Sequence, residues 1–385
     1  MTHSADRSKL HKIFILSPGP KYNLENAFKE RCESLSLQYR GRILTSGPKY
    51  ERQRYGEFDV ICIKDARAKS WASTVGFVLI SLWEIIKAII IKDRYRLFVT
   101  YDPLKTGLIG TLVSAITKIK LVVEVNGDYM SDAIYAPIDN FYKRHLRRLL
   151  MIWVEKFVLN HASGIKLLYP AQIDSFKPLP HQPYISCFPN YVNAGAFSNN
   201  GDTKEVLFAG FPFAIKGVDI LIAAFKIAST KHPDWTLKIL GHYPDKTQLN
   251  QHIDGHPKIH HLKAVDPSEM PLQIGACGIF VLPSRTEAMG RVLVEAMAAG
   301  KPRIGANVAG IPTVIDNNSD GLLFESENVE DLANKLDALM SDENLRTQIG
   351  KNARKRYLEH FKPEFYFHRL NAFYSDVINS SGPAD

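Results

Sequence analysis

Short apolar runs alternate with longer segments of helical periodicity along the whole chain. Ten of these runs are rich in β-branched and aromatic residues, which predicts buried strands. They lie at 13–19, 58–64, 96–103, 120–127, 164–170, 205–212, 236–243, 258–265, 277–284 and 302–308. Because strands separated by helices usually pair in parallel, the pattern predicts an α/β protein with two doubly wound, Rossmann-like domains and a cleft between them.

A polar stretch, "NAGAFSNNGDT" at 193–203, interrupts this alternation and is the candidate linker. The chain has 385 residues, whereas a single core rarely grows beyond about 250–300 residues. We therefore expect one domain at 1–195 and a second at 204–360.

Two helical segments carry long apolar stretches. The first, 74–91, is almost long enough to cross a bilayer, but it contains Glu84 and Lys87. Since each charge near a membrane centre costs about 2.5–3.5 kcal/mol, we expect a buried or membrane-leaning helix instead. The second, 140–162, is basic and amphipathic. It either lies on an anionic membrane or packs its apolar face against the domain and leaves its charged face in water. Its cations among Leu, Trp and Phe are Lys143, Arg144, Arg147 and Arg148.

The composition is that of an ordinary soluble globular protein, with 45% hydrophobic and 23% charged residues. The four cysteines form no C-x-x-C pair, so we interpret them as reduced thiols in a cytoplasmic protein rather than disulfides or zinc ligands. The apolar run after Lys12 is only as long as a strand, and no signal peptide is predicted.

Charge is distributed unevenly along the chain. Residues 1–200 carry 28 Lys+Arg against 17 Asp+Glu, a net charge of +11, while the remainder carries 20 against 23, or −3. The basic half predicts an anionic partner, which could be a phosphate, a nucleic acid or a membrane surface. The chain has no recognisable nucleic-acid-binding module, so no nucleic acid is expected.

The stretch "SRTEAMGRVLVEAMAAGKP", residues 284–302, holds two glutamates eight residues apart. The pattern predicts a turn and then a helix that stops at Gly300, with Glu287 in the loop and Glu295 in the first turns of the helix. Loop amides and a helix N-terminus attract an anion such as phosphate, and a carboxylate just beyond can accept hydrogen bonds from the two hydroxyls of a ribose. The spacing suits a nucleotide joined through phosphate to a sugar; the alternative is a helix with two surface glutamates.

This stretch resembles the retaining GT-B glycosyltransferases of family four (glycosyl transferases group 1), of the bacterial cell-surface polysaccharide type. That family is known by an E-x7-E pair, which here is Glu287 and Glu295 followed by "AMAAGKP". The segment "FAGFPFAIKG" is similar to the family's G-R-L-x-x-x-K-G, with Gly210, Lys216 and Gly217 in place. Further matches are "PNYVNAGAF", "WTLKILG", "VAGIPTVI" and "DGLLF".

The resemblance implies a GT-B fold, whose two domains face each other across a cleft and whose C-terminal helix, 361–385, packs back toward the first domain. It also implies a hexosyltransferase that moves a sugar from a nucleotide-sugar, UDP- or GDP-linked, with retention and without metal or other cofactor. The first domain would bind the acceptor, a glycan or a lipid-linked sugar, and the second the donor. The expected setting is cell-envelope polysaccharide or lipopolysaccharide synthesis at the cytoplasmic face of the inner membrane.

Residue roles carry over position by position. Glu287 would hold the hydroxyls of the donor sugar and Glu295 the ribose, while Lys216 would meet the diphosphate charge, so that Glu287 and Lys216 are the catalytic candidates. Backbone amides near sugar and phosphate would come from Ala288, Met289 and Gly290. On the acceptor side the candidates are Asn126, Gly127 and Asp128. Asn126 stands where many members have histidine, and because an amide takes no proton it should bind rather than act as a base.

One departure bears on activity. Phe211 stands where the family has an arginine beside the diphosphate. Either Arg285 or Arg291, which flank Glu287, replaces that cation, or the chain is a GT-B-like subunit that has lost activity and binds partners in a glycan assembly complex.

Overall fold

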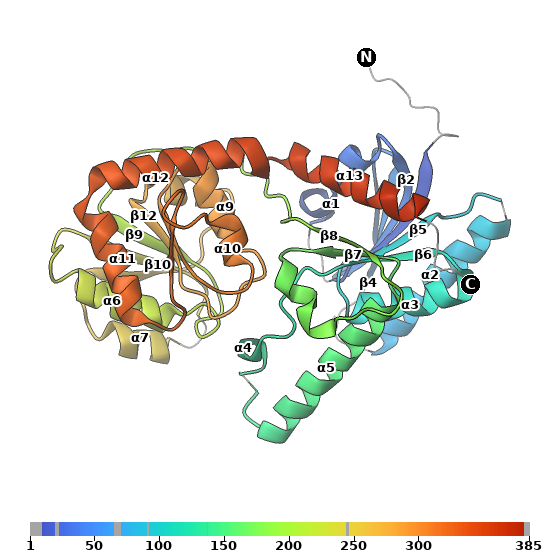
Figure 1. The fold of residues 1–385 in the computed structure, drawn as a ribbon, viewed down its shortest axis with the longest axis horizontal. Coiled ribbons are helices and arrows are strands. Elements are labelled where there is room, and N and C mark those ends of the chain that lie inside the picture. Colours follow the sequence, from blue (N-terminus) through green and yellow to red (C-terminus); the bar gives the residue numbers. More distant parts are fainter. Residues whose placement is uncertain are drawn as a thin grey trace, which may run out of the picture. The chain divides into compact units, whose positions relative to one another are not determined.

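The computed structural model describes residues 10–19, 23–64, 71–90, 92–136, 138–243 and 246–380. These form two compact α/β units, each with its own sheet between helices (Figure 1). The first unit comprises the chain up to Met130, Asn140–Phe188 and everything from Phe367 onward; the second comprises Ser131–Asp139 and Pro189–Tyr366. The predicted two-unit α/β architecture with parallel sheets is confirmed.

The first unit contains an eight-stranded sheet in the order β3-β4-β2-β1-β5-β6-β7-β8. Every neighbouring pair is parallel except β3 and β4, which form a hairpin. The strands are β1 His11–Leu16, β2 Tyr39–Gly47, β3 Glu51–Tyr55, β4 Phe58–Lys64, β5 Leu97–Thr100, β6 Lys120–Glu124, β7 Gly164–Leu167 and β8 Tyr184–Cys187. Apolar runs in β1, β5 and β6 are fully buried, because helices cover both faces of a parallel sheet.

Two helices of this unit, which begin at Leu24 and Phe141, start directly after asparagine caps. The Asn23 side chain accepts a hydrogen bond from the amide of Asn26, and Asn140 accepts one from the amide of Lys143, each of which satisfies a first-turn donor. The helices are α1 Leu24–Leu35, α2 Trp71–Ile90, α3 Lys105–Thr117, α5 Phe141–His161 and the 3-10 helix η2 Pro170–Phe176. None of the helices in the described part of the chain is both long and apolar enough to span a membrane.

The second unit contains a six-stranded, all-parallel sheet in the order β11-β10-β9-β12-β13-β14. Its strands are β9 Glu205–Ala209, β10 Thr236–Leu240, β11 Ile259–Leu262, β12 Ile279–Leu282, β13 Arg303–Ala306 and β14 Leu322–Phe324. Its helices are α4 Asp132–Tyr135, α6 Val218–Ala228, α7 Thr247–Ile253, α8 Met270–Ala276, α9 Arg291–Ala298, α10 Ile311–Val314, α11 Val329–Ser341, α12 Glu343–Arg356 and the π-turn η3 Tyr357–Phe361.

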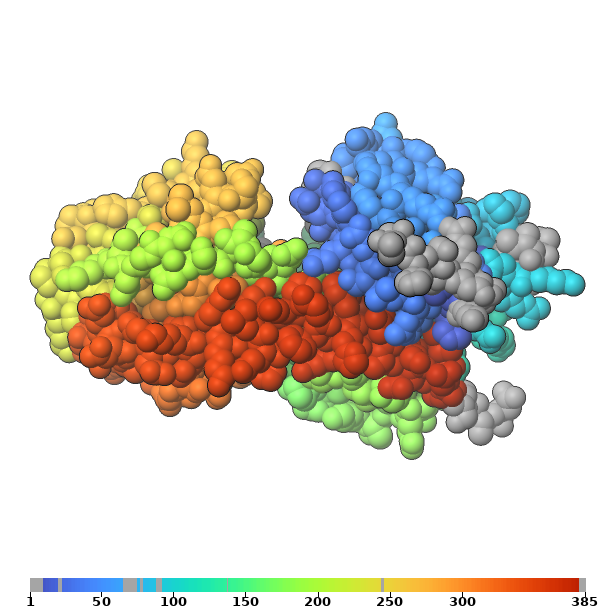
Figure 2. Space-filling model, turned by 90° about the horizontal axis from the view of Figure 1, so that it is seen from above, coloured from blue at the N-terminus to red at the C-terminus, as the bar shows by residue number. Residues whose placement is uncertain are grey.

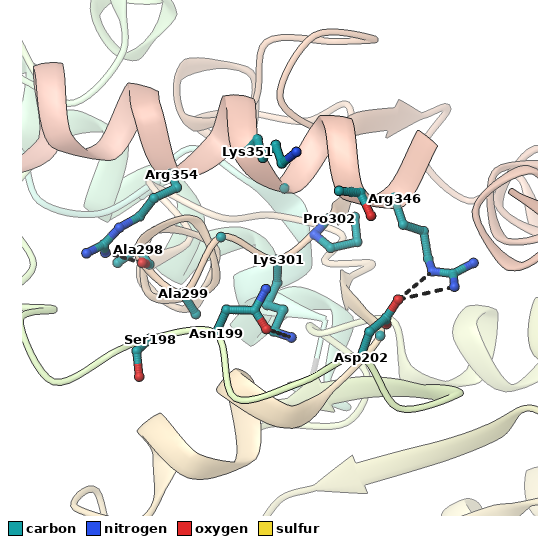
Figure 3. Close-up of a pocket in the computed structure, with 14 residues that line it drawn as sticks. Ser198, Asn199, Asp202, Ala298, Ala299, Lys301, Pro302, Arg346, Lys351 and Arg354 are labelled. Atoms are coloured by element: carbon teal, nitrogen blue, oxygen red, sulfur yellow. Dashed lines mark hydrogen bonds and ion pairs between the residues drawn. The ribbon is translucent and has the colours of Figure 1, made fainter. Parts of the chain in front are cut away.

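The predicted linker packs along the second unit. Figure 2 shows this yellow-green segment beside the red α12. Lys301 donates to the side chain of Asn199 at 2.8 Å, and Arg346 of α12 pairs with Asp202 at 3.2 Å. These contacts surround a pocket of about 320 Å³ between the segment, the end of α9 and α12 (Figure 3). The lysine of "AMAAGKP" therefore anchors the linker to the second unit.

The last helix, α13 Pro363–Asn379, completes the first unit from Phe367 onward. The Tyr374 hydroxyl donates to Glu124 at 2.7 Å, and the Arg31 guanidinium pairs with the same carboxylate at 2.6 Å. Burial would raise the pKa of Glu124, but the charges of Arg31 and Lys166 and these hydrogen bonds lower it. A carboxylate from β6 is thus kept charged in the core by groups from three elements, α1, β7 and α13.

Candidate functional site

Loops after two neighbouring strands converge in the second unit. Because β9 and β12 pair in parallel, the loop after β9 and the loop after β12 leave the same edge of the sheet, which is the edge where open α/β sheets bind ligands. Gly217 ends the first loop with φ 63°, and a Cβ there would lie 2.0 Å from the carbonyl oxygen of Pro283 in the second. Only glycine permits both this backbone angle and this approach.

Arg285 fixes the position of the first loop. Its backbone amide donates to Ile215 at 2.9 Å. Its guanidinium forks onto both oxygens of Asp219, at 2.9 and 2.7 Å, and pairs with Glu327 at 2.7 Å. The structure thus brings Arg285 to the site with its guanidinium held by two carboxylates. Sequence analysis did not identify Asp219. It lies in the first turn of α6, where the helix amides favour a negative charge.

Lys216 and Glu287 form an ion pair where the two loops meet. The side chains are 21% and 18% exposed, so the pair is reachable from solvent yet partly shielded. The Gly310 amide donates to the Glu287 carbonyl at 2.9 Å, and a Cβ at Gly310 would lie 1.8 Å from the carbonyl oxygen of Ala288. The backbone that carries the carboxylate is therefore fixed on its other side by the segment before α10.

The start of α9 supplies further polar groups. Gly290 occupies the N-cap with φ 78°, and no side chain caps this helix end. First-turn amides without a side-chain cap carry the positive end of the helix dipole and can bind an anion. Met289 is buried beneath the loop, with Ala288 half-buried beside it. Glu287 thus stands directly before an uncapped helix N-terminus.

Glu295 lies one turn into α9, and its side chain is 12% exposed. Arg291, four residues earlier on the same face, contacts it at 3.3 Å and is itself 70% exposed. Burial raises the pKa of Glu295, and the neighbouring guanidinium lowers it by less. The structure places Glu295 as a mostly buried carboxylate within the candidate site rather than on the open surface.

Phe211 lies in the first loop and is 55% exposed. Its ring centre is 6.3 Å from that of Tyr243, whose hydroxyl donates to the Gly210 carbonyl at 2.9 Å. The two aromatic residues help to line a pocket of about 530 Å³. Its other lining residues are Ala133, Ala136, Pro212, Phe213, Ala214, Ile215, Gln248 and Arg285. The residue at the position where the resembled family has an arginine, Phe211, is therefore part of an aromatic wall of this pocket.

The acceptor candidates lie in the first unit, directly after β6. The Asn126 amide donates to the carbonyl of Tyr101 at 3.0 Å, and Gln172 donates to the carbonyl of Gly127 at 3.0 Å. Asp128 follows on the same loop and raises the pKa of the Tyr169 hydroxyl after the larger effect of burial. These three candidates are thus held by hydrogen bonds at a strand end of the first unit.

Glu155 of α5 is a buried carboxyl that sequence analysis did not single out. Burial, followed by the charge of Asp128, raises its pKa to about 8. The sequence signal that could have identified Glu155 is that it is the only acidic residue in the basic amphipathic helix α5.

A family model described as glycosyl transferases group 1 matches residues 194–356. This segment belongs to the glycosyl transferases group 1 family. It runs from the linker to the end of α12 and so contains every donor candidate named above. The matched segment is 42% of the chain by length, and the whole first unit lies outside it.

Several curated proteins resemble the chain. An uncharacterised glycosyltransferase of Methanocaldococcus jannaschii is 33% identical over 170 residues, covering 43% of this chain and 46% of that protein. The capsular polysaccharide biosynthesis glycosyltransferase CapM of Staphylococcus aureus is 29% identical over 171 residues, covering 43% and 44%. The chain spans less than half the length of these two relatives. A UDP-Gal:alpha-D-GlcNAc-diphosphoundecaprenol alpha-1,3-galactosyltransferase of Escherichia coli is 24% identical over 320 residues, covering 78% and 79%.

Solved structures match over almost the whole chain. Sucrose-phosphate synthase from Thermosynechococcus elongatus superposes with a TM-score of 0.76 at 20% identity, covering 96% of this chain and 100% of that one. Anabaena HepE in complex with UDP superposes with a TM-score of 0.69 at 17% identity, covering 95% and 100%. The fold is therefore the GT-B fold, as the motifs predicted.

Proposed function

We propose that the protein is a metal-independent, retaining glycosyltransferase that moves a hexosyl group from a UDP- or GDP-linked sugar to a glycan or lipid-linked acceptor. The observation that carries the proposal is the Lys216–Glu287 ion pair at the meeting point of the loops after β9 and β12, directly before the uncapped start of α9. A cation, a carboxylate and helix amides at one point suit a ligand that has both phosphates and sugar hydroxyls.

The arrangement accounts for departure of the diphosphate. As the bond from the anomeric carbon to the diphosphate oxygen breaks, negative charge grows on the leaving group and must be met by fixed positive groups. Lys216 and the first amides of α9 are those groups, and Glu287 accepts hydrogen bonds from the sugar hydroxyls. Donor binding thus separates the ion pair, because the diphosphate binds the ammonium of Lys216 and the sugar hydroxyls donate to the carboxylate of Glu287. Glu295 receives the ribose hydroxyls one turn further along α9.

The acceptor belongs to the first unit in this proposal. Asn126, Gly127 and Asp128 bind its polar groups, and the +11 charge of residues 1–200 favours an anionic, lipid-linked acceptor at a membrane surface. The four cysteines are free thiols, which suits a reducing, cytoplasmic location at the inner membrane. The relatives that build capsular polysaccharide or act on a diphosphoundecaprenol-linked sugar support a role in cell-envelope polysaccharide or lipopolysaccharide synthesis.

A thermal-shift comparison of UDP-, GDP- and ADP-sugars selects the donor, because a ligand that binds only the folded state raises its stability. With that donor, Glu287→Ala should lower turnover by roughly tenfold or more, since an oriented contact to the reacting sugar is lost. Glu295→Ala should mainly weaken donor affinity, and EDTA should leave transfer intact. The matched control is Glu330→Ala, at an exposed glutamate in the first turn of α11.

The alternative, an inactive subunit of an assembly complex, predicts another pattern. It requires that no nucleotide-sugar stabilise the protein and that Glu287→Ala change neither turnover nor ligand affinity. Loss of activity in EDTA with recovery on addition of magnesium or manganese would instead refute the metal-independent mechanism.

A further inference from the structure

Three helices of the first unit carry apolar side chains on their outward faces. These side chains recur every three or four residues, the spacing of one helix face. They are Val75, Leu79, Trp83 and Ile86 on α2; Leu108, Leu112 and Ile116 on α3; and Tyr142, Leu146, Leu149, Leu150 and Trp153 on α5. The same helices bury other apolar residues in the core, including Ile85, Val113 and Val158. Each helix is therefore apolar on two sides, and packing within the unit accounts for only one of them.

The three outward stripes adjoin. The helix α3 packs against both α2 and α5 and lies between them (Figure 1). Its exposed apolar side chains therefore neighbour those of the other two helices. We call the twelve side chains together the apolar face. Contiguous exposed apolar surface of this kind marks an interaction site, whereas single exposed apolar residues do not. Trp83, Trp153 and Tyr142 on this face are residue types that concentrate where membrane and water meet.

The charges around the apolar face are positive. Lys87, Lys143, Arg147 and Lys156 are exposed on α2 and α5. The helix α3 contains no acidic residue. The acids of the other two helices are withdrawn from the surface, because Glu84 pairs with Arg42 and Glu155 is buried. Apolar side chains among unopposed cations are the composition of helices that lie in the interface of an anionic bilayer.

We propose that the apolar face inserts into the headgroup–acyl boundary of an anionic membrane, with α2, α3 and α5 lying along the bilayer surface. Long basic side chains can keep their charge among the headgroups while their stems cover apolar surface. A second copy of the chain is a poor occupant, because its face would present the same positive charge. The inference deepens the proposed function, on whose membrane location it rests; it concerns the first unit and is measured without donor or acceptor.

Vesicle partition of the full chain tests the proposal. Binding to mixed phosphatidylcholine–phosphatidylglycerol vesicles should exceed binding to pure phosphatidylcholine vesicles, and high salt should weaken it without abolishing it. Ile116→Glu and Leu146→Glu, both at positions more than 60% exposed, should each lower partition about tenfold, the loss expected for one inserted aliphatic side chain. Leu37→Glu, at a position 76% exposed away from these helices, is the matched control and should leave partition unchanged.

Depth of insertion is read from tryptophan fluorescence. In a Trp71→Phe background, which removes the fourth tryptophan of the chain, lipids brominated on the acyl chain should quench Trp83 and Trp153, and adding Trp83→Phe/Trp153→Phe should abolish most of that quenching. Trp235 is buried in the second unit and supplies an unquenched background.

Several results would overturn the proposal. Complete release by salt together with absent quenching would mean that only charge holds the protein on the vesicle. A dimer in sedimentation that Leu146→Glu converts to monomer, without vesicle binding by either form, would assign the face to a second copy. Donor-induced thermal shifts of the same variants should equal those of wild type, so that failure here is separable from failure of the proposed function.

Discussion

Glu155 binds a proton more tightly in the folded state than in the unfolded state. Its folded pKa is about 8 against an ordinary value of 4.5. A raised carboxyl pKa stabilises the folded state fully below the unfolded pKa, and this contribution is lost as pH rises through the folded pKa. Between about pH 5 and pH 8 the free energy of unfolding should therefore fall by about 1.4 kcal/mol per pH unit on account of this group.

Urea denaturation of wild type and Glu155→Gln across this range tests the assignment. The amide cannot titrate, so the variant should lack that part of the slope. Parallel stability curves for the two proteins would mean that the carboxyl ionises normally in the folded state.

The two arginines that flank Glu287 should behave differently. Arg285→Ala removes the fork onto Asp219 and the support of the Lys216 loop, so it should lower both the free energy of unfolding and donor affinity. Arg291 is mostly exposed and lies one turn nearer the α9 N-terminus than Glu295. If Arg291 replaces the cation missing at Phe211, Arg291→Ala should weaken nucleoside-diphosphate binding by roughly tenfold or more at unchanged stability.

Calorimetry with the nucleoside diphosphate and the monophosphate distinguishes these roles, because loss of a phosphate contact should affect the diphosphate more. If each nucleotide bound Arg291→Ala as tightly as it binds wild type, Lys216 would be the principal cation. Arg291 would then contribute only its contact with Glu295.

At the scale of elements, the donor site depends on contact between two loops. Gly217→Ala would place a Cβ against the Pro283 carbonyl oxygen and would also require alanine to adopt an unfavourable φ. Gly255→Ala is the matched control, since its φ is +66° and nothing lies within 4 Å of the added atom. The control should cost about 1–2 kcal/mol for the left-handed backbone alone, whereas Gly217→Ala should cost more and also reduce donor affinity.

Denaturation of the two variants, followed by donor titration, measures both effects. Equal destabilisation with unchanged donor affinity would mean that the loop contact is not required for the site.

The elements that could be predicted from sequence are those with continuous apolar runs. Strands such as β9 and β12, which lead into the donor loops, are buried on both faces, so their hydrophobicity is unbroken. The strand β2 was missed because Arg40 and Arg42 interrupt its pattern, and their charges are met by Asp93 and Glu84 from other elements. Such long-range pairing has no local signal.

The edge strands β8 and β14 escaped prediction for a different reason. The strand β8 is four residues long and largely exposed, and β14 has three residues. At the site, Glu287 and Glu295 could be found from their spacing in a loop and a helix start, and Gly210 and Gly217 from the resemblance to the family's motif. The partners of Arg285 could not, because Asp219 and Glu327 lie 66 and 42 residues from it in the chain.

At the scale of the whole molecule, the first unit depends on the end of the chain. Tyr374→Phe removes a buried hydrogen bond to the charged Glu124 and should lower the free energy of unfolding of the first unit by about 1.5–3 kcal/mol. Tyr184→Phe is the matched control, because its hydroxyl meets Asp376 at 2.7 Å on the surface, where the loss should be near zero.

Hydrogen exchange resolves the two units in this comparison. Protection in β1, β5 and β6 should fall in Tyr374→Phe, while protection in β9 and β12 and donor affinity should stay at wild-type levels. A uniform loss across both sheets would mean that the units unfold together.

The same dependence sets the order in which the protein matures during its synthesis. Glu124 leaves the ribosome 250 residues ahead of Tyr374, a delay on the order of ten to fifty seconds at roughly 5–20 residues per second. During that interval the Arg31–Glu124 pair lacks the helix that covers it, so the first unit stays incomplete until α13 has been made. A message cut short before the codons of α13 should therefore yield a chain whose first unit lacks one of its helices and is more readily cleaved by proteases.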